Sequence, residues 1–412
     1  MKFREHTLAN GLEVVAECND EARSMALGFF VKTGARDETD EVSGVSHFLE
    51  HMVFKGTARR TADDVNRDFD VMGAHYNAFT SEEKTVYYAA VLPEYQGAAV
   101  ELLADIMRPA LREEDFDTEK QVIIEEIRMY EDQPPFGADD RCRALHFGRH
   151  PLGRSVLGTV ESITALRVEA MRAYFAERYS PKNIALVASG QVDFQALVAA
   201  AEKCCGHWEA FPTRREVAPA QSARHFECLV KDTATQEYAI QLANGPSATD
   251  HDRFAAKILA TILGDDSGSR LYWEMVDPGL ADGASLGHHD YQGTGLYFSY
   301  FSCAPEYAES NLQRMLDIYR EAEASGATAE ELEQAKNKIN SRVVLSSERP
   351  RGRLFNVGAN WTYRHEYRSV KDDLAAVDAV TLGELSDVLR KYPLTTSTTM
   401  IVGPLAGIAA PS

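Results

Sequence analysis

The segment His47-Phe48-Leu49-Glu50-His51 constrains this chain more than any other part of it. Apolar residues recur around it at helical spacing and Ser43 is a suitable N-cap, which predicts a helix. Offsets of zero, three and four lie on one face of a helix. His47, Glu50 and His51 therefore point the same way, and the two imidazoles are close enough to bind one metal ion.

A zinc ion held by two imidazoles needs at least one more protein ligand, and a catalytic site also keeps one position open for water. The best candidate lies on a second predicted helix, residues 116–132. Its expected buried stripe consists of Val122, Ile123, Ile127 and Tyr130. Glu119 and Glu126 are seven positions apart and share one face. We therefore assign Glu126 to the metal and Glu119 to the shell behind it.

Both patterns also have ordinary explanations. A histidine pair four residues apart arises by chance, and by itself it fits a packed or surface pair as well as a metal site. Carboxylates seven apart are typical of a solvated helix face. A site closed by four protein ligands would be structural and not catalytic. The residues around the motif decide between these alternatives.

The wider sequence resembles the inverzincin peptidases, the family of zinc metallopeptidases that includes pitrilysin, insulysin and the mitochondrial processing peptidase. The resemblance begins with GVSHFLEHMVFKGT at residues 44–57. Residues 73–81 and 85–88 look like the family's strand pair after the zinc helix. Residues 122–127, VIIEEI, match the segment that carries the third ligand, and Glu126 lies 75 positions after His51. Shorter matches follow at residues 150–153, 158–159 and 179–184.

The resemblance implies that the chain is a zinc-dependent endopeptidase. His47, His51 and Glu126 would bind one Zn2+ per chain. Glu50 would be the general base, and Glu119 would be a carboxylate behind the metal ligands. Physical reasons support both assignments, because Glu50 can take a proton from water and pass it to the leaving amine. A carboxylate behind the ligands would orient an imidazole N–H.

Peptide substrates are expected to bind at the strand that contains Asn77, Ala78 and Phe79. In similar enzymes this edge strand pairs with an extended peptide, so that backbone hydrogen bonds provide affinity for many sequences. Asn77 matches a position whose side chain contacts the peptide near the metal. Without the resemblance, an ordinary turn asparagine would be the simpler interpretation.

Strands and helices alternate without the period of a parallel βαβ array, which predicts an α+β fold. Strands are expected at residues 11–16, 25–33, 74–80 and 85–91. Helices are expected at residues 94–107, 116–132, 161–178 and 193–204.

Two similar closing segments suggest an internal duplication. Residues 179–190 end one half, and the similar residues 392–403 lie 213 positions later. The expected architecture is two homologous α/β-sandwich domains, each with an antiparallel-rich sheet and helices packed on it. The predicted divisions are a zinc-binding peptidase domain at 1–210, a linker at 211–224 and a domain without a metal site at 225–412.

Composition fits an enzyme of two or more domains, because 412 residues with 44% hydrophobic and 26% charged side chains can bury large cores. No stretch reaches the about 20 apolar residues that a membrane span needs. The N-terminal residues lack the apolar core of a secretory signal, so we expect a cytoplasmic protein without a membrane span.

The formal net charge of −20 opposes nucleic-acid binding. None of the six cysteines has Cys-x-x-Cys spacing, which predicts reduced thiols.

The resemblance also implies a partner subunit. In the family, a two-domain chain of this kind is half of a clamshell, and single-chain members contain two such halves. A closed shell would enclose the zinc and admit only peptides or unfolded segments.

The second half contains one departure from the family pattern. Residues 268–282 resemble a segment in which active relatives carry an arginine and then a tyrosine that hold the substrate carbonyl. Here those positions are Val276 and Asp282, while Arg270 matches a structural element. Losing both donors weakens stabilisation of the oxyanion. We prefer a heterodimer in which a homologous metal-free subunit supplies them; the alternative is a homodimer that works poorly or with other donors.

A non-catalytic scaffold or peptide-binding subunit of the same fold is the second functional hypothesis. Retention of all four candidate metal and base residues argues against it. A scaffold has no physical need for an intact metal site, whereas hydrolysis fails without one.

Overall fold

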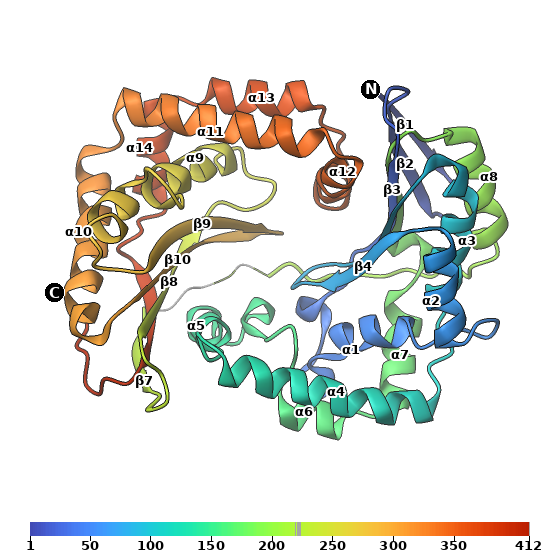
Figure 1. The fold of residues 1–412 in the computed structure, drawn as a ribbon, viewed down its shortest axis with the longest axis horizontal. Coiled ribbons are helices and arrows are strands. Elements are labelled where there is room, and N and C mark those ends of the chain that lie inside the picture. Colours follow the sequence, from blue (N-terminus) through green and yellow to red (C-terminus); the bar gives the residue numbers. More distant parts are fainter. Residues whose placement is uncertain (219, 221–223, 412) are drawn as a thin grey trace. The chain divides into compact units, whose positions relative to one another are not determined.

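The computed structural model describes residues 1–218, 220 and 224–411 (Figure 1). The chain forms two compact units, and each has its own sheet and takes segments from both halves of the sequence. The first unit comprises Met1–Arg128, Arg154–Glu216 and Leu345–Arg368. The second comprises Met129–Gly153, Val217–Val344 and Ser369–Ser412. The predicted α+β class is confirmed.

The first unit contains a six-stranded sheet in the order β1-β2-β6-β3-β5-β4. Its strands are β1 (Lys2–Thr7), β2 (Glu13–Cys18), β3 (Met25–Val31), β4 (His75–Thr80), β5 (Thr85–Val91) and β6 (Ile184–Gly190). Only β2 and β6 pair in parallel. Every residue of β3 is buried, because helices cover both faces of the sheet at its centre. Strand β4 lies at one edge, and β1 was not anticipated from the sequence.

The second unit contains a five-stranded sheet that repeats this arrangement. Its strands are β7 (Phe226–Val230), β8 (Glu237–Gly245), β9 (Gly283–Tyr291), β10 (Thr294–Cys303) and β11 (Ser397–Gly403). Their order is β7-β11-β8-β10-β9, which matches β2-β6-β3-β5-β4 in the first unit. The pair β7 and β11 is parallel like β2 and β6, and the other pairs are antiparallel. The shared topology agrees with the predicted duplication.

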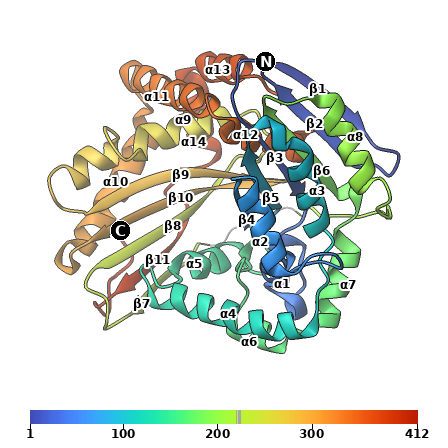
Figure 2. The ribbon, with the colours of Figure 1, turned by 45° about the vertical axis from the view of Figure 1, so that its right-hand side comes forward.

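Helices pack on both faces of the sheet of the first unit, and α3 and α8 lie side by side on one face (Figure 2). The helices of this unit are α1 (Val45–Val53), α2 (Ala62–Val71), α3 (Gln96–Ile106), most of α4 (Glu113–Asp132), α6 (Val160–Ala165), α7 (Val168–Arg178), α8 (Phe194–Cys205) and α12 (Pro350–Arg364). The single helix predicted at 161–178 is two helices. Lys120 Nζ donates to the carbonyls of Thr164 and Leu166, at 3.2 and 2.7 Å, and so stabilises the break.

Helices of the second unit are α5 (Ala138–Phe147), α9 (Arg253–Gly264), α10 (Ala308–Ser325), most of α11 (Ala329–Ser347), α13 (Val370–Ala379) and α14 (Leu382–Lys391). A π-helical turn, Tyr272–Val276, precedes β9. Among the described residues, no helix combines the length and the apolarity needed to cross a membrane.

Each sheet is covered partly by a helix from the other half of the sequence. Helix α12, near the C-terminal end, packs against β6 and β3 and buries Leu354, Val357 and Trp361 beside Phe30. Helix α5, from the N-terminal half, packs against β11 and β8. Helix α12 is the third helix after β10, and α5 is the third helix after β5, so the two helices occupy equivalent positions in the two halves. The compact units therefore differ from the contiguous division at 1–210 and 225–412.

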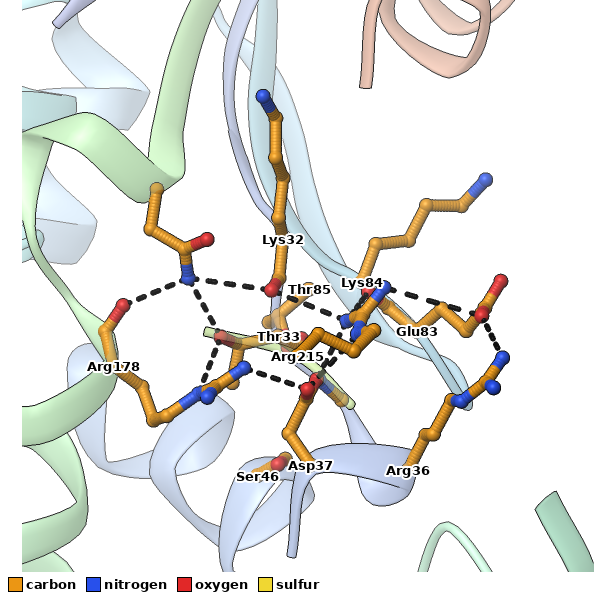
Figure 3. Close-up of polar contacts among 12 residues, drawn as sticks. Lys32, Thr33, Arg36, Asp37, Ser46, Glu83, Lys84, Thr85, Arg178 and Arg215 are labelled. Carbon is orange, nitrogen blue, oxygen red and sulfur yellow. Dashed lines mark hydrogen bonds and ion pairs between the residues drawn. The ribbon is translucent and has the colours of Figure 1, made fainter. Parts of the chain in front are cut away.

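The predicted linker is anchored to the first unit through Arg215 (Figure 3). Its Nε donates to Asp37 Oδ1 at 2.9 Å, and its Nη2 donates to the carbonyl of Glu83 at 2.6 Å. Arg178 Nη2 lies 2.6 Å from the same Asp37 carboxylate. Arg215 is therefore part of a buried ion-pair network and not of a solvated linker. Residues 219 and 221–223 of the predicted linker lie outside the described residues.

Candidate metal centre

The N-cap of helix α1 is Gly44 and not the expected Ser43. Gly44 has a φ of +88°, which favours glycine, and a Cβ there would lie 2.5 Å from the carbonyl oxygen of Leu157. The buried carboxylate of Glu38 accepts hydrogen bonds from the N–H groups of Gly44 and Ser46, both at 2.7 Å. Burial raises the pKa of Glu38 to about 7 despite these bonds. The Ser43 prediction was wrong because a side chain from outside the helix caps it.

His47, His51 and Glu126 converge from α1 and α4. Their ligand atoms all lie within 4.8 Å of one another. Glu126 Oε2 is 3.7 Å from His47 Nε2 and 3.6 Å from His51 Nε2, too far for hydrogen bonds. Two ligand atoms held tetrahedrally by one zinc ion at about 2.0–2.1 Å lie about 3.3 Å apart. The separations therefore suit three ligands of one ion better than direct contacts.

Glu119 orients His51 from behind. Its Oε1 lies 2.9 Å from His51 Nδ1, and its Oε2 is 2.5 Å from Lys55 Nζ. If Nδ1 carries the proton of a neutral ring, Nε2 directs a lone pair toward the Glu126 carboxylate. A lone pair and a carboxylate facing each other repel unless a cation lies between them. The chemistry of this donor set therefore fits a divalent metal ion.

The two histidines respond differently to their surroundings. Burial, together with the nearby His51, lowers the pKa of His47 to about 3, so this ring is neutral and available as a ligand. Burial also acts to lower the pKa of His51. The hydrogen bond to Glu119 and the charges of Glu126 and Glu50 outweigh it, and the net effect is a raised pKa.

Glu50 lies beside the ligands and is held by a residue that sequence reasoning missed. Thr80, at the end of β4, donates from Oγ1 to Glu50 Oε2 at 2.7 Å. Burial raises the pKa of Glu50, and the bond from Thr80 partly opposes this shift. In the sequence, the only signal for this role of Thr80 is that it ends the predicted edge strand. Its contact with Glu50 spans 30 positions and follows no local pattern.

The exposed and buried faces of α4 differ from the expected ones. Val122 and Tyr130, predicted to be buried, are 47% and 54% exposed. The buried residues are Phe116, Glu119, Ile123, Ile124 and Ile127. Val122 shares a face with Glu126, four residues on, and this face is left open beside the ligand. Ile123 and Ile127 are buried as predicted, whereas Val122 and Tyr130 were wrongly assigned because α4 turns the carboxylate of Glu119 inward.

The predicted substrate residues lie on β4, whose only described strand partner is β5. Asn77 is exposed, and its Oδ1 accepts from the N–H of Ala78 at 2.9 Å. Side chains alternate along a strand. Ala78 packs in the core that contains α1, on the same side as Thr80, whereas Phe79 packs against Phe355 of α12. Asn77 therefore projects on the Phe79 side, away from Glu50.

Two positions, at which the resemblance implies catalytic donors in active relatives, have other contacts in the second unit. Val276 ends the π-helical turn and packs against the core of this unit. Asp282 Oδ2 accepts from Gln236 Nε2 at 2.6 Å. Arg270 pairs with both carboxylate oxygens of Glu331, at 2.7 and 2.9 Å. This bidentate pair agrees with a structural role for Arg270.

Comparisons with known proteins identify the family. Residues 13–160 match the family described as "Insulinase (Peptidase family M16)", and residues 165–339 match "Peptidase M16 inactive domain". A Streptomyces coelicolor protein named as an uncharacterized zinc protease is 32% identical over 98% of this chain and 90% of its own length. The chain belongs to peptidase family M16. The resemblance to pitrilysin and its relatives is thereby confirmed.

Solved structures with the same fold cover nearly the whole chain. A protease from Helicobacter pylori aligns with a TM-score of 0.92 and 22% identity, covering 98% of this chain and 99% of that one. A chain in the structure of complex III2 from Candida albicans aligns with a TM-score of 0.87 and 17% identity, covering 99% of this chain and 97% of that chain. At these identities the likeness shows a shared fold.

Proposed function

We propose that this M16 family chain is a zinc endopeptidase that cleaves peptides or unfolded segments. One observation carries the proposal: His47, His51 and Glu126 present three ligand atoms to one point. They would hold one Zn2+, with Glu119 behind His51. When bound, the ion would polarise a peptide carbonyl and lower the pKa of water. Relatives named as zinc proteases support the choice of metal.

Glu50 is proposed as the general base. Its raised pKa makes it a better proton acceptor than an exposed carboxylate. It would take a proton from water and return it to the leaving amine, so that Glu50 is unchanged after each cycle. Thr80 would keep the carboxylate turned toward the ligands through its hydrogen bond.

Substrate is proposed to bind along β4 as an added strand. The free edge of β4 offers backbone groups to an extended peptide near Asn77, Ala78 and Phe79. Such pairing provides affinity without reading side chains, and an enclosed chamber would limit substrates by size.

A partner subunit is part of the proposal. Val276 and Asp282 offer no cationic or phenolic donor for the oxyanion, and such donors are worth about 3–4 kcal/mol in other sites. A homologous metal-free subunit that supplies them in a heterodimer is preferred over a homodimer. Mixing this chain with a homologous metal-free chain should raise peptide cleavage well above that of either alone. If this chain alone cleaves peptides as fast as the mixture does, no heterodimer is required.

A cytoplasmic location stays a prediction from the sequence.

The alternative function is a scaffold or peptide-binding subunit without catalysis. The single observation that favours this alternative is that Val276 and Asp282 replace the expected arginine and tyrosine donors. A closed structural metal site is disfavoured, because three ligands leave a position open.

The decisive experiment combines metal analysis with peptide digestion for the wild type and Glu50→Gln, each with its partner. We expect one zinc per chain in both, and hydrolysis only in the wild type, because glutamine cannot accept the proton. Chelation should abolish cleavage, and added zinc should restore it. Equal hydrolysis by Glu50→Gln would remove Glu50 from the mechanism, and absence of bound metal in the wild type would remove the proposal.

A further inference from the structure

A pocket of about 350 Å³ with several charged lining residues lies within the first unit, and none of its residues belongs to the metal centre. Helices α3 and α8 form its walls, and the segments that follow these helices, together with Arg59 between α1 and α2, complete it. Its lining residues are Arg59, Glu101, Ala104, Asp105, Arg108, Lys203, Cys204, His207 and Trp208.

The acidic residues of this pocket already have cationic partners. Glu101 Oε1 accepts from Arg59 Nη2 at 2.8 Å. Asp105 Oδ2 accepts from Arg60 Nη1 and from Thr57 Oγ1, each at 2.8 Å. Arg59 and Arg60 therefore offset most of this acidic charge, although Arg60 also pairs with Asp68.

Arg108 has no carboxylate partner among the described residues. Its Nη1 donates to the carbonyl of Met107 at 2.7 Å and its Nη2 to that of Tyr179 at 3.3 Å. The guanidinium lies 3.7 Å from the centre of the Trp208 ring, which holds its plane in place. A guanidinium has five N–H donors, so three remain after these two bonds. Burial lowers the pKa of Arg108 to about 10, and it stays charged at neutral pH.

Lys203 adds a second cation, which forms no ion pair in the described part of the chain, although its charge helps to lower the pKa of Glu101. The pocket therefore has an excess of positive charge, although the whole chain has a formal net charge of −20. A partly desolvated cation is costly unless an anion compensates it. Arginine donors in a fixed plane match the oxygens of phosphate and carboxylate groups.

We propose that this pocket binds a small ligand through a phosphate or carboxylate group, held by Arg108 and Lys203. Trp208 forms the wall on which the guanidinium is ordered. The volume suits a small molecule. Phosphate and carboxylate share the oxyanion that this pair recognises, so the test uses a probe of each kind.

The test follows the fluorescence of Trp208 in the full chain. The protein has three tryptophans, so Trp273→Phe with Trp361→Phe leaves Trp208 as the reporter. Inorganic phosphate and succinate are titrated at constant ionic strength. We expect a saturable change with at least one of them. The anion that saturates identifies the group bound, whereas no saturable change with either would overturn the proposal.

Two variants assign the binding to the pocket. Lys203→Glu should weaken binding at least tenfold, and Lys371→Glu, an exposed lysine outside the pocket, should leave it unchanged. Arg108→Met should abolish binding in a chain whose circular dichroism matches the wild type. The titration is repeated in a His51→Ala background, where phosphate has no intact metal site. Equal binding by the two lysine variants, or loss of binding in the His51→Ala background, would contradict the proposal.

Discussion

Glu119 is the residue of α4 that contacts Nδ1 of His51, on the side of the ring away from Glu126. We expect Glu119→Gln to weaken zinc binding by about 10- to 100-fold, because the neutral amide no longer favours a metal-bound imidazole or pairs with Lys55. Competition with a chelator measures the affinity. Glu125→Gln is the matched control, since this neighbouring carboxylate pairs with Arg128 on an exposed face. Equal affinities for the two variants would contradict the role of Glu119.

His146 is a buried histidine whose titration should affect stability. It lies on α5, with Nδ1 3.3 Å from Thr398 Oγ1, and burial lowers its pKa from 6.5 to about 4. The unfolded chain therefore binds this proton more readily, and stability is lost as the pH falls from 6.5 to 4. The loss amounts to about 3 kcal/mol, at about 1.4 kcal/mol for each pKa unit.

Urea unfolding between pH 4 and 7 tests this prediction. His146→Asn should flatten the pH dependence relative to the wild type, whereas the exposed His207→Asn should retain it. Parallel curves for the wild type and His146→Asn would show that His146 does not contribute.

At the scale of elements, α12 should stabilise the first unit although it lies near the C-terminal end of the sequence. Leu354 is fully buried against the sheet, whereas Leu345 is 63% exposed. We expect Leu354→Ala to cost about 2–5 kcal/mol and Leu345→Ala less than about 0.5 kcal/mol. Denaturant unfolding measures both. Similar losses for the two leucines would mean that α12 is not packed as described.

The elements themselves were largely predictable, because hydrophobic periodicity is a local signal. The strands near residues 25–33, 74–80 and 85–91 and the helix that carries Glu126 occur where expected. The buried face of that helix was not predictable. Val122 and Tyr130 are apolar enough to suggest burial, but neighbours distant in sequence determine which face of α4 is covered.

At the scale of the whole molecule, the exchange of α5 and α12 should make the two halves of the sequence depend on each other. A fragment of residues 1–210 lacks α12 and would expose the sheet face around Phe30. We expect it to bind a hydrophobic dye and to unfold at a lower temperature than the full chain. Co-expression with residues 211–412 should restore both properties. An isolated fragment as stable as the full chain would contradict this dependence.

The candidate metal residues could be found from the sequence because their spacing is a local property. Two histidines four apart and two glutamates seven apart share helix faces wherever those helices lie. The resemblance then linked the two helices and indicated the M16 family. By contrast, the capping of α1 by Glu38, the bond from Thr80 to Glu50, the burial of Arg215 and the uncompensated charge of Arg108 appeared only in the folded chain. Each joins residues from separate elements, and such contacts depend on how the sheets and helices pack, which no short segment encodes.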